Sequence, residues 1–71
     1  MKSIRERIEN DFTYHAPVPD QVTRYNQLRE SAKAFAILIV ELTPESREQS
    51  LALTQLETSV MFANAAIARN E

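Results

Sequence analysis

The chain has 71 residues, a formal net charge of −2 and no cysteine. This length allows one small domain at most, and the lack of cysteine excludes disulfides and thiolate metal sites. With a single histidine the chain also cannot form a histidine-rich metal site, so we expect neither a metal nor a cofactor. A negative net charge argues against polymeric DNA or RNA as a partner, because counterion release requires a basic face.

The sequence predicts neither a signal peptide nor a membrane span. Its first eleven residues are charged throughout, whereas a signal peptide needs an apolar stretch. The longest apolar run covers residues 34–40 and is far too short to cross a bilayer. We therefore expect a soluble intracellular protein with no membrane contact.

The first predicted element is a short helix over residues 3–10. Ser3 and Glu6 form a capping-box pattern ahead of the apolar residues Ile4 and Ile8. A helix of about two turns is marginal by itself. We expect it to dock on the main helices or on a neighbouring subunit.

Residues 11–20, DFTYHAPVPD, are predicted to form a structured loop. Its X-Pro steps favour extended backbone, and a stiff loop is a suitable place for ligand contacts by Phe12, Tyr14 and His15. The alternative is that Phe12 and Tyr14 fill the space between the main helices and that His15 is merely exposed.

Two long helices are predicted over residues 21–42 and 44–70. Asp20 can cap the first helix. The second can begin at Pro44 with Thr43 as its cap, or at Ser46 with Gln49 completing a capping box. Because the chain has no glycine, the turn between the helices must use right-handed or extended backbone geometry.

Both long helices carry apolar residues at intervals of three and four. The stripes are Tyr25, Leu28, Ala32, Phe35, Ile39 and Leu42 in the first helix, and Leu53, Leu56, Val60, Ala63 and Ile67 in the second. Such stripes predict that the helices pair as an antiparallel hairpin. Residues 34–40, AFAILIV, are apolar on all sides, and one partner helix covers only one face. The predicted fold is therefore an all-α hairpin with a short N-terminal helix, assembled as a homo-oligomer.

Most charged side chains have an opposite charge one helical turn away, which is typical of a solvated helix surface. The pairs are Lys2 with Glu6, Arg5 with Glu9, Arg7 with Asp11, Asp20 with Arg24, and Glu30 with Lys33. Three arginines lack such a partner: Arg29, Arg47 and Arg69. Arginine binds phosphate through two charge-assisted hydrogen bonds, but plain solvation or a salt bridge between subunits is the alternative for each.

Tyr25, Arg29 and Lys33 recur at intervals of four on one stripe of the predicted helix 21–42. With Tyr14 from the loop, they would combine aromatic surfaces for bases with cations for phosphates. The alternative for Tyr25 is a core position between the paired helices.

The segment SREQSLALTQLE, followed by MFANAAIARN, resembles the C-terminal helix of small phage-encoded sponges that sequester cyclic oligonucleotide signals. These sponges are the anti-CBASS sponge and the hairpin domain that it shares with a Thoeris anti-defence sponge. The resemblance continues through FTYHAPVPDQ, YNQLRESAK and the LTP turn, and so covers nearly the whole chain.

The resemblance implies tight binding of cyclic oligonucleotide messengers in the host cytoplasm, without cleavage, by a hexamer with pockets between subunits. It implies Tyr14 as a stacking residue of a cyclic dinucleotide pocket, with Arg29 or Lys33 as the phosphate ligand. Phe12 and His15, from the same loop as Tyr14, are further candidates for this pocket.

For a cyclic trinucleotide pocket at a three-fold contact, the resemblance implies Arg69 as the phosphate ligand. Ser31 and Asn70 are candidates for supporting hydrogen bonds. The loop segment APVPD, residues 16–20, departs from the family pattern, which is richer in proline, lysine and glycine there. A missing cation and a missing glycine would change which ligands fit.

The sequence offers little support for catalysis. It contains no cysteine nucleophile, no glycine-rich phosphate loop and no HExxH motif, and its carboxylates are scattered. The alternative to a nucleotide sponge is a small oligomeric adaptor whose apolar stripes recruit a partner helix.

Overall fold

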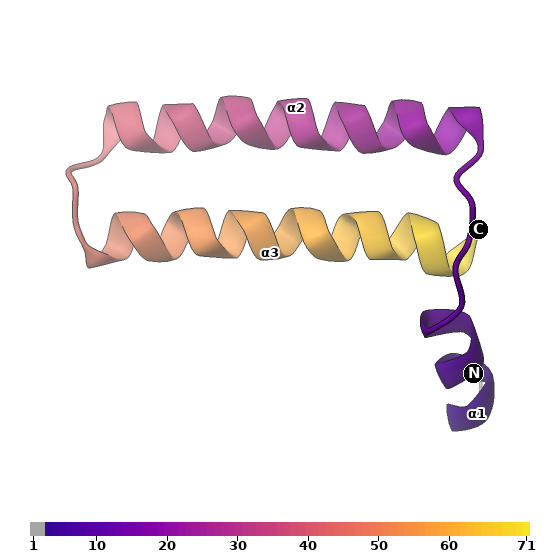
Figure 1. Ribbon diagram of the computed structural model, residues 1–71. Coiled ribbons are helices and arrows are strands. Elements are labelled where there is room, and N and C mark those ends of the chain that lie inside the picture. Colours follow the sequence, from indigo (N-terminus) through magenta and orange to yellow (C-terminus); the bar gives the residue numbers. More distant parts are fainter. Residues whose placement is uncertain (1–2) are drawn as a thin grey trace.

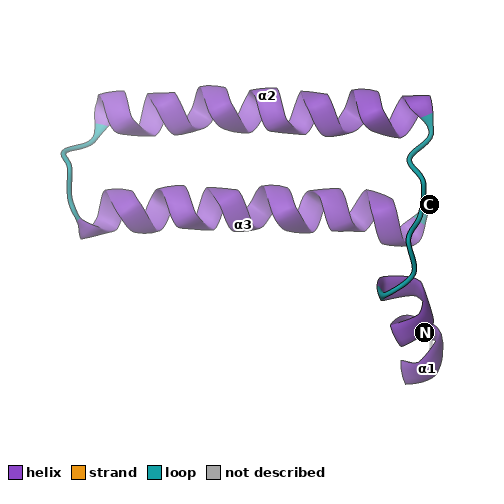
Figure 2. Ribbon diagram, in the orientation of Figure 1, coloured by secondary structure: helices purple, strands orange, loops and turns teal. Residues whose placement is uncertain are grey.

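The computed structural model describes residues 3–71, which form three helices and no strand. Helix α1 spans Ile4–Asp11, α2 spans Pro19–Leu42 and α3 spans Arg47–Asn70. Figure 1 shows α2 and α3 antiparallel and side by side, with α1 beside the C-terminus at the end opposite the turn. We call that end of the molecule the open end (Figure 2). The predicted all-α fold is confirmed.

Helix α1 begins where the capping pattern predicts. The Ser3 hydroxyl accepts a hydrogen bond from the Glu6 backbone N–H at 3.2 Å, which satisfies one of the unpaired donors of the first turn. The ion pair predicted between Lys2 and Glu6 lies outside the described residues. The side chains of Ile4 and Ile8 are 65% and 50% exposed, so α1 does not bury its apolar face on the hairpin.

Helix α2 begins at Pro19 rather than at Gln21, and Asp20 does not cap it. Val18 occupies the N-cap position, and its backbone N–H donates to Gln21 Oε1 at 3.1 Å. Proline suits the first turn because it lacks an N–H that would be unpaired there, and its fixed φ is already helical. The prediction of an Asp20 cap was therefore wrong by about half a turn.

Helix α3 does not begin at Pro44; it begins after Ser46, the second of the two predicted starts. The Ser46 hydroxyl accepts from the Gln49 backbone N–H at 3.1 Å. The Gln49 side chain donates to the Thr43 carbonyl and hydroxyl at 3.1 and 3.0 Å. These bonds satisfy the turn without any positive φ angle among the described residues, as the lack of glycine predicted.

No described side chain of the single chain is fully buried. Its accessible surface is 5981 Å², against about 4,500 Å² for a compact monomer of this mass. Its radius of gyration is 15.5 Å, against about 11 Å for a compact chain of this length. The hairpin is therefore a single layer of two helices without an enclosed core.

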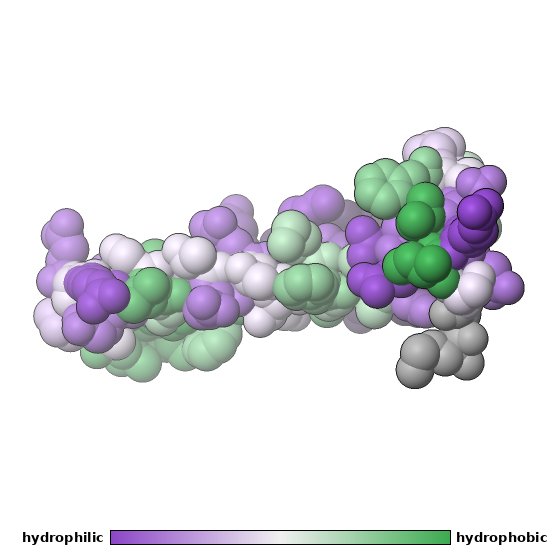
Figure 3. Space-filling model, turned by 90° about the horizontal axis from the view of Figure 1, so that it is seen from below, coloured by the Kyte–Doolittle hydropathy of each residue, from purple (hydrophilic) through white to green (hydrophobic). Residues whose placement is uncertain are grey.

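The predicted stripe of α2 is only partly right. Tyr25, Leu28, Ala32 and Ile39 are half-buried toward α3, but Phe35 is 53% exposed and Leu42 is 73% exposed. Residues 34–40 are apolar all round, so intervals of three and four alone do not single out the face that meets α3. Figure 3 shows hydrophobic side chains on the surface along the hairpin and around the open end.

Candidate ligand-binding site

The open end of the hairpin contains a hollow of about 600 Å³, which we call the open-end hollow. The loop before α2 contributes Tyr14 and His15, α2 contributes Arg24 and Tyr25, and Glu71 follows the end of α3. The Tyr14 side chain is 84% exposed, so its ring is available to a ligand. Phe12 is 86% exposed and does not line this hollow. The alternative that Phe12 and Tyr14 fill the space between the main helices is therefore wrong.

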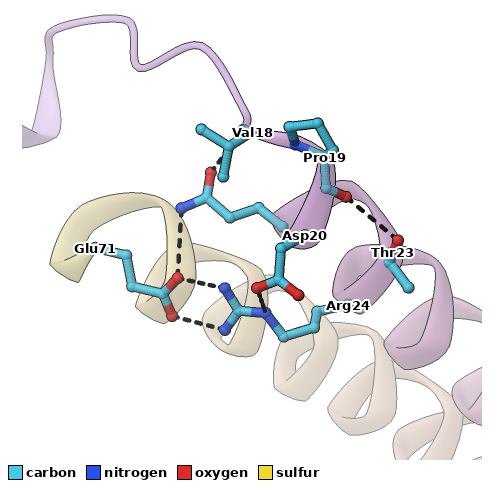
Figure 4. A network of polar contacts seen from close by, with 7 residues as sticks. Val18, Pro19, Asp20, Thr23, Arg24 and Glu71 are labelled. Atoms are coloured by element: carbon cyan, nitrogen blue, oxygen red, sulfur yellow. Dashed lines mark hydrogen bonds and ion pairs between the residues drawn. The ribbon is translucent and has the colours of Figure 1, made fainter.

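Arg24 is the centre of a polar network at this hollow (Figure 4). Its Nη1 donates to Glu71 Oε2 at 2.7 Å, and its Nη2 donates to Glu71 Oε1, so the guanidinium meets the carboxylate through two parallel bonds. Arg24 Nε lies 3.1 Å from Asp20 Oδ2, one turn earlier on α2. Gln21 adds a longer hydrogen bond to Glu71 Oε1 at 3.4 Å. The network ties the start of α2 to the end of α3.

This network shifts the ionisation of both partners. The hydrogen bond from Arg24 lowers the pKa of the Glu71 carboxyl, because it stabilises the charged form, and partial desolvation opposes that shift. The Glu71 hydrogen bond in turn raises the pKa of Arg24. Glu71 is therefore a carboxylate, and Arg24 a cation, across the neutral pH range.

A second set of polar contacts holds α1 and its loop to the end of α3. Asn10 Nδ2 donates to the Arg69 carbonyl at 2.8 Å, and Arg69 Nε lies 3.5 Å from Asp11 Oδ1. His15 Nε2 lies 2.9 Å from the Asn10 carbonyl oxygen, a contact that requires a proton on that nitrogen. The expected docking of α1 is therefore made within the chain by polar contacts, while its apolar side chains remain exposed.

Arg29 and Lys33 line a different depression, which we call the apolar groove. It has a volume of about 880 Å³ and runs along one side of the α2–α3 pair, where Ile37, Val40 and Leu53 contribute to its lining. Arg29 Nη1 donates to Asn26 Oδ1 at 3.2 Å. Lys33 has no ion-pair partner within the part of the chain that the structure describes.

The predicted set of Tyr14, Tyr25, Arg29 and Lys33 is therefore split between two places. Tyr14 and Tyr25 line the open-end hollow, whereas Arg29 and Lys33 line the apolar groove. Each interval of four residues advances the helix by about 400°, so two intervals turn the side chain by about 80°. That drift places Tyr25 toward α3 and Lys33 to the side.

The candidates for a trinucleotide pocket also lie apart within one chain. Ser31 lines a shallow hollow of about 420 Å³ with Gln27, Leu28 and Arg24. Asn70 donates to the Ala66 carbonyl at 3.0 Å, a local contact within the last turn of α3. Arg69 Nε lies 3.5 Å from Asp11 Oδ1, so Arg69 has an ion-pair partner within the same chain.

Arg24 is the residue that sequence reasoning missed. Its ion pair with Asp20 was predicted correctly, as was that of Arg7 with Asp11 at 3.7 Å. The predicted pairs of Arg5 with Glu9 and of Glu30 with Lys33 do not form among residues 3–71. Because Asp20 lies one helical turn away, the sequence already supplied an ion-pair partner for Arg24. The spacing of charged residues gave no indication of a contact with Glu71.

Residues 3–71 contain neither a metal site nor a membrane-spanning helix. No group of three histidine, aspartate or glutamate side chains between positions 3 and 71 is arranged to hold a metal ion. Over the same range, no helix has the length and apolar character needed to cross a membrane.

A sequence model of the Acb2/Tad1 hairpin domain matches residues 5–68, which is most of the chain. The chain belongs to the Acb2/Tad1 hairpin family. This is the anti-CBASS and anti-Thoeris sponge family that the sequence resemblance predicted, and the match extends from α1 to the last turn of α3. Searches of curated proteins and of solved structures gave no match.

Proposed function

We propose that this Acb2/Tad1 hairpin protein binds cyclic oligonucleotide second messengers without cleaving them, and so keeps them from the host proteins that they activate. The observation that carries the proposal is the family match over residues 5–68. Sequestration needs abundant sites with a dissociation constant below the messenger concentration, and it needs no catalytic group. The messengers are cyclic dinucleotides and, at a second pocket type, cyclic trinucleotides.

The chemistry of the open-end hollow supports this function. Tyr14 and Tyr25 offer aromatic surfaces for stacking, and Arg24 offers a planar group for phosphate. The volume of about 600 Å³ lies within the usual range for sites that hold small molecules. In the apolar groove, Arg29 and Lys33 are two further cations, and Glu41 and Glu57 line the same groove.

The function also requires assembly, which we propose to be a homohexamer in the host cytoplasm. Three apolar side chains in the C-terminal half of α2, those of Phe35, Ile37 and Val40, are more than half exposed in the single chain. Water contact with such side chains is unfavourable, so a second copy that covers them stabilises the hairpin. Packing of copies would bring Tyr14 of one subunit toward Arg29 or Lys33 of another, as a pocket between subunits needs.

Isothermal titration with cyclic GMP–AMP, other cyclic dinucleotides and cyclic trinucleotides tests the proposal, with linear dinucleotides as the control. We expect submicromolar binding of at least one cyclic ligand. Mass spectrometry of the released ligand should find it intact. If no cyclic ligand produces heat, the protein is instead an oligomeric adaptor for a partner helix.

Two variants of Tyr14 test the dinucleotide pocket. Tyr14→Ala should weaken cyclic dinucleotide binding about tenfold or more, because it removes a stacking surface. Tyr14→Phe keeps the ring and should bind nearly as well as the unmodified protein. Cyclic trinucleotide binding should change little in either variant. Equal loss for both ligand classes would mean that the loop does not belong to a separate dinucleotide pocket.

A further inference from the structure

The Arg24–Glu71 pair places an anion in contact with the only arginine that lines the open-end hollow, within the described residues. Two parallel hydrogen bonds from one guanidinium to two oxygens are also the way arginine binds the two free oxygens of a phosphodiester. The Glu71 carboxylate therefore occupies a position that suits a phosphate group.

We propose that Arg24 binds a phosphate of the cyclic nucleotide at the open-end hollow, and that Glu71 is an internal competitor which this phosphate displaces. The proposal rests on the function proposed above and names a residue and a regulatory contact for the same site. It adds Arg24 to the candidate phosphate ligands Arg29 and Lys33, which line the apolar groove.

The geometry around Arg24 favours an exchange of anions. Asp20 Oδ2 lies 3.1 Å from Arg24 Nε on the same helix, so Asp20 does not occupy the two Nη atoms that hold Glu71. When Glu71 leaves, these two Nη atoms are free for the incoming phosphate. A phosphate restores the lost charge pairing, so Arg24 is not left without an anion.

Glu71 is also held in a way that allows it to leave. It lies beyond the last residue of α3, and its side chain is 39% exposed. Its side-chain contacts with described residues are those with Arg24 and a longer one with Gln21. An exposed ion pair contributes little net stability, because water solvates both partners well.

The aromatic residues of the hollow complete the site. Tyr14 and Tyr25 line the same depression as Arg24 and offer stacking surfaces beside the position of the carboxylate. A nucleotide brings both a base for an aromatic ring and a phosphate for the guanidinium. A simple carboxylate ligand would satisfy Arg24 but would leave the rings unused.

The test is a double-mutant cycle on the full chain, read by isothermal titration with the tightest cyclic ligand of the panel. Glu71→Gln removes the competitor and should tighten binding about two- to fivefold, the range expected for an exposed ion pair. Arg24→Gln should weaken binding about tenfold or more, because a charge-assisted double hydrogen bond is lost. In the double variant, Glu71→Gln should have no further effect.

Two more variants keep the test decisive. Glu30→Gln removes an exposed carboxylate of α2 outside the hollow and should leave binding unchanged, which separates local competition from net charge. Arg24→Lys keeps the charge and the fold but loses the forked geometry, and should bind more weakly than the unmodified protein. Circular dichroism verifies that each variant is helical.

The outcomes separate this proposal from the proposed function. If the unmodified protein binds a cyclic ligand and neither Arg24 variant weakens binding, Arg24 is not a phosphate ligand, while the sponge function stands. If Glu71→Gln weakens binding, Glu71 is part of the site and not a competitor. If neither the unmodified protein nor Glu71→Gln binds any cyclic ligand, both proposals are wrong.

Discussion

Arg24 and Glu71 lie 47 positions apart along the chain, yet Arg24 Nη1 donates to Glu71 Oε2 at 2.7 Å across the open end of the hairpin. This contact joins the first turns of α2 to the residue that follows α3. It is the only ion pair between these two parts of the molecule within residues 3–71.

The Arg24–Glu71 ion pair leads to a prediction about the pKa of the Glu71 carboxyl group. The pKa of Glu71 is lowered in the folded chain, chiefly by the Arg24 hydrogen bond. The contact therefore stabilises the open end at pH values above the unfolded pKa of Glu71, and this contribution is lost as the pH falls through the folded pKa. Carbon-13 NMR of the Glu71 side chain should show the lowered pKa, and Arg24→Ala should raise it toward the ordinary value.

A milder variant serves as the control for that measurement. Gln21→Ala removes the 3.4 Å hydrogen bond to Glu71, and the bond from the Val18 N–H, but leaves Arg24 in place. It should therefore raise the pKa of Glu71 less than Arg24→Ala does. A larger effect of Gln21→Ala would contradict the leading role of Arg24.

The apolar groove contains a position at which a substitution should weaken the proposed self-association. Ile37 lines the groove and is 51% exposed in the single chain. Ile37→Glu puts a charge where a second copy would exclude water, so the dissociation constant of the assembly should rise about tenfold or more. Sedimentation velocity at several micromolar concentrations measures this. As a control, Gln55→Glu adds the same charge at an exposed position on α3, outside the groove, and should leave the assembly intact.

The cap of α3 predicts a measurable loss of stability. Ser46→Ala removes the acceptor of the Gln49 N–H, so the free energy of unfolding should fall by about 1 kcal/mol. Urea denaturation at a fixed protein concentration measures it. Ser59→Ala, in the interior of the same helix, should be neutral or slightly stabilising because alanine is the better helix former. Equal losses in both variants would mean that the cap contributes nothing.

A proposed role of Arg69 as a phosphate ligand can be distinguished from its contact with Asp11. As a phosphate ligand of a trinucleotide pocket, it predicts that Arg69→Ala weakens cyclic trinucleotide binding and leaves dinucleotide binding nearly unchanged. As the partner of Asp11 at 3.5 Å, it also holds α1. Asp11→Asn breaks that contact but keeps the arginine, so it should retain trinucleotide binding. If Asp11→Asn reproduces the loss, Arg69 acts by positioning α1.

The helices were predictable because their signals are local. Ser3 and Ser46 cap their helices as the sequence indicated. The starts of α2 and α3 were harder to predict, for a physical reason. Pro19 can enter the first turn of α2. The Thr43 hydroxyl does not cap α3 but donates back to the Ile39 carbonyl at 2.6 Å. A sequence with two chemically valid caps a few residues apart does not choose between them.

The candidate site was only partly predictable, because its contacts connect distant parts of the chain. Tyr14 and His15 were expected in a ligand-contacting loop, and the structure puts both at the open-end hollow. Spacing pairs Arg24 with Asp20 and says nothing of Glu71, a partner 47 positions away that follows α3. The packing face of α2 was also ambiguous, since Phe35 and Ile39 are equally apolar and only Ile39 turns toward α3.

The lack of any fully buried side chain among residues 3–71 has a consequence for the cell. If copies gather as proposed, much of the hydrophobic free energy of folding is gained only when they meet, and mass action then ties the folded population to the amount synthesised. The capacity to absorb a messenger would rise more steeply than in proportion to expression. Slow synthesis of the protein would then give little protection until a threshold amount had accumulated.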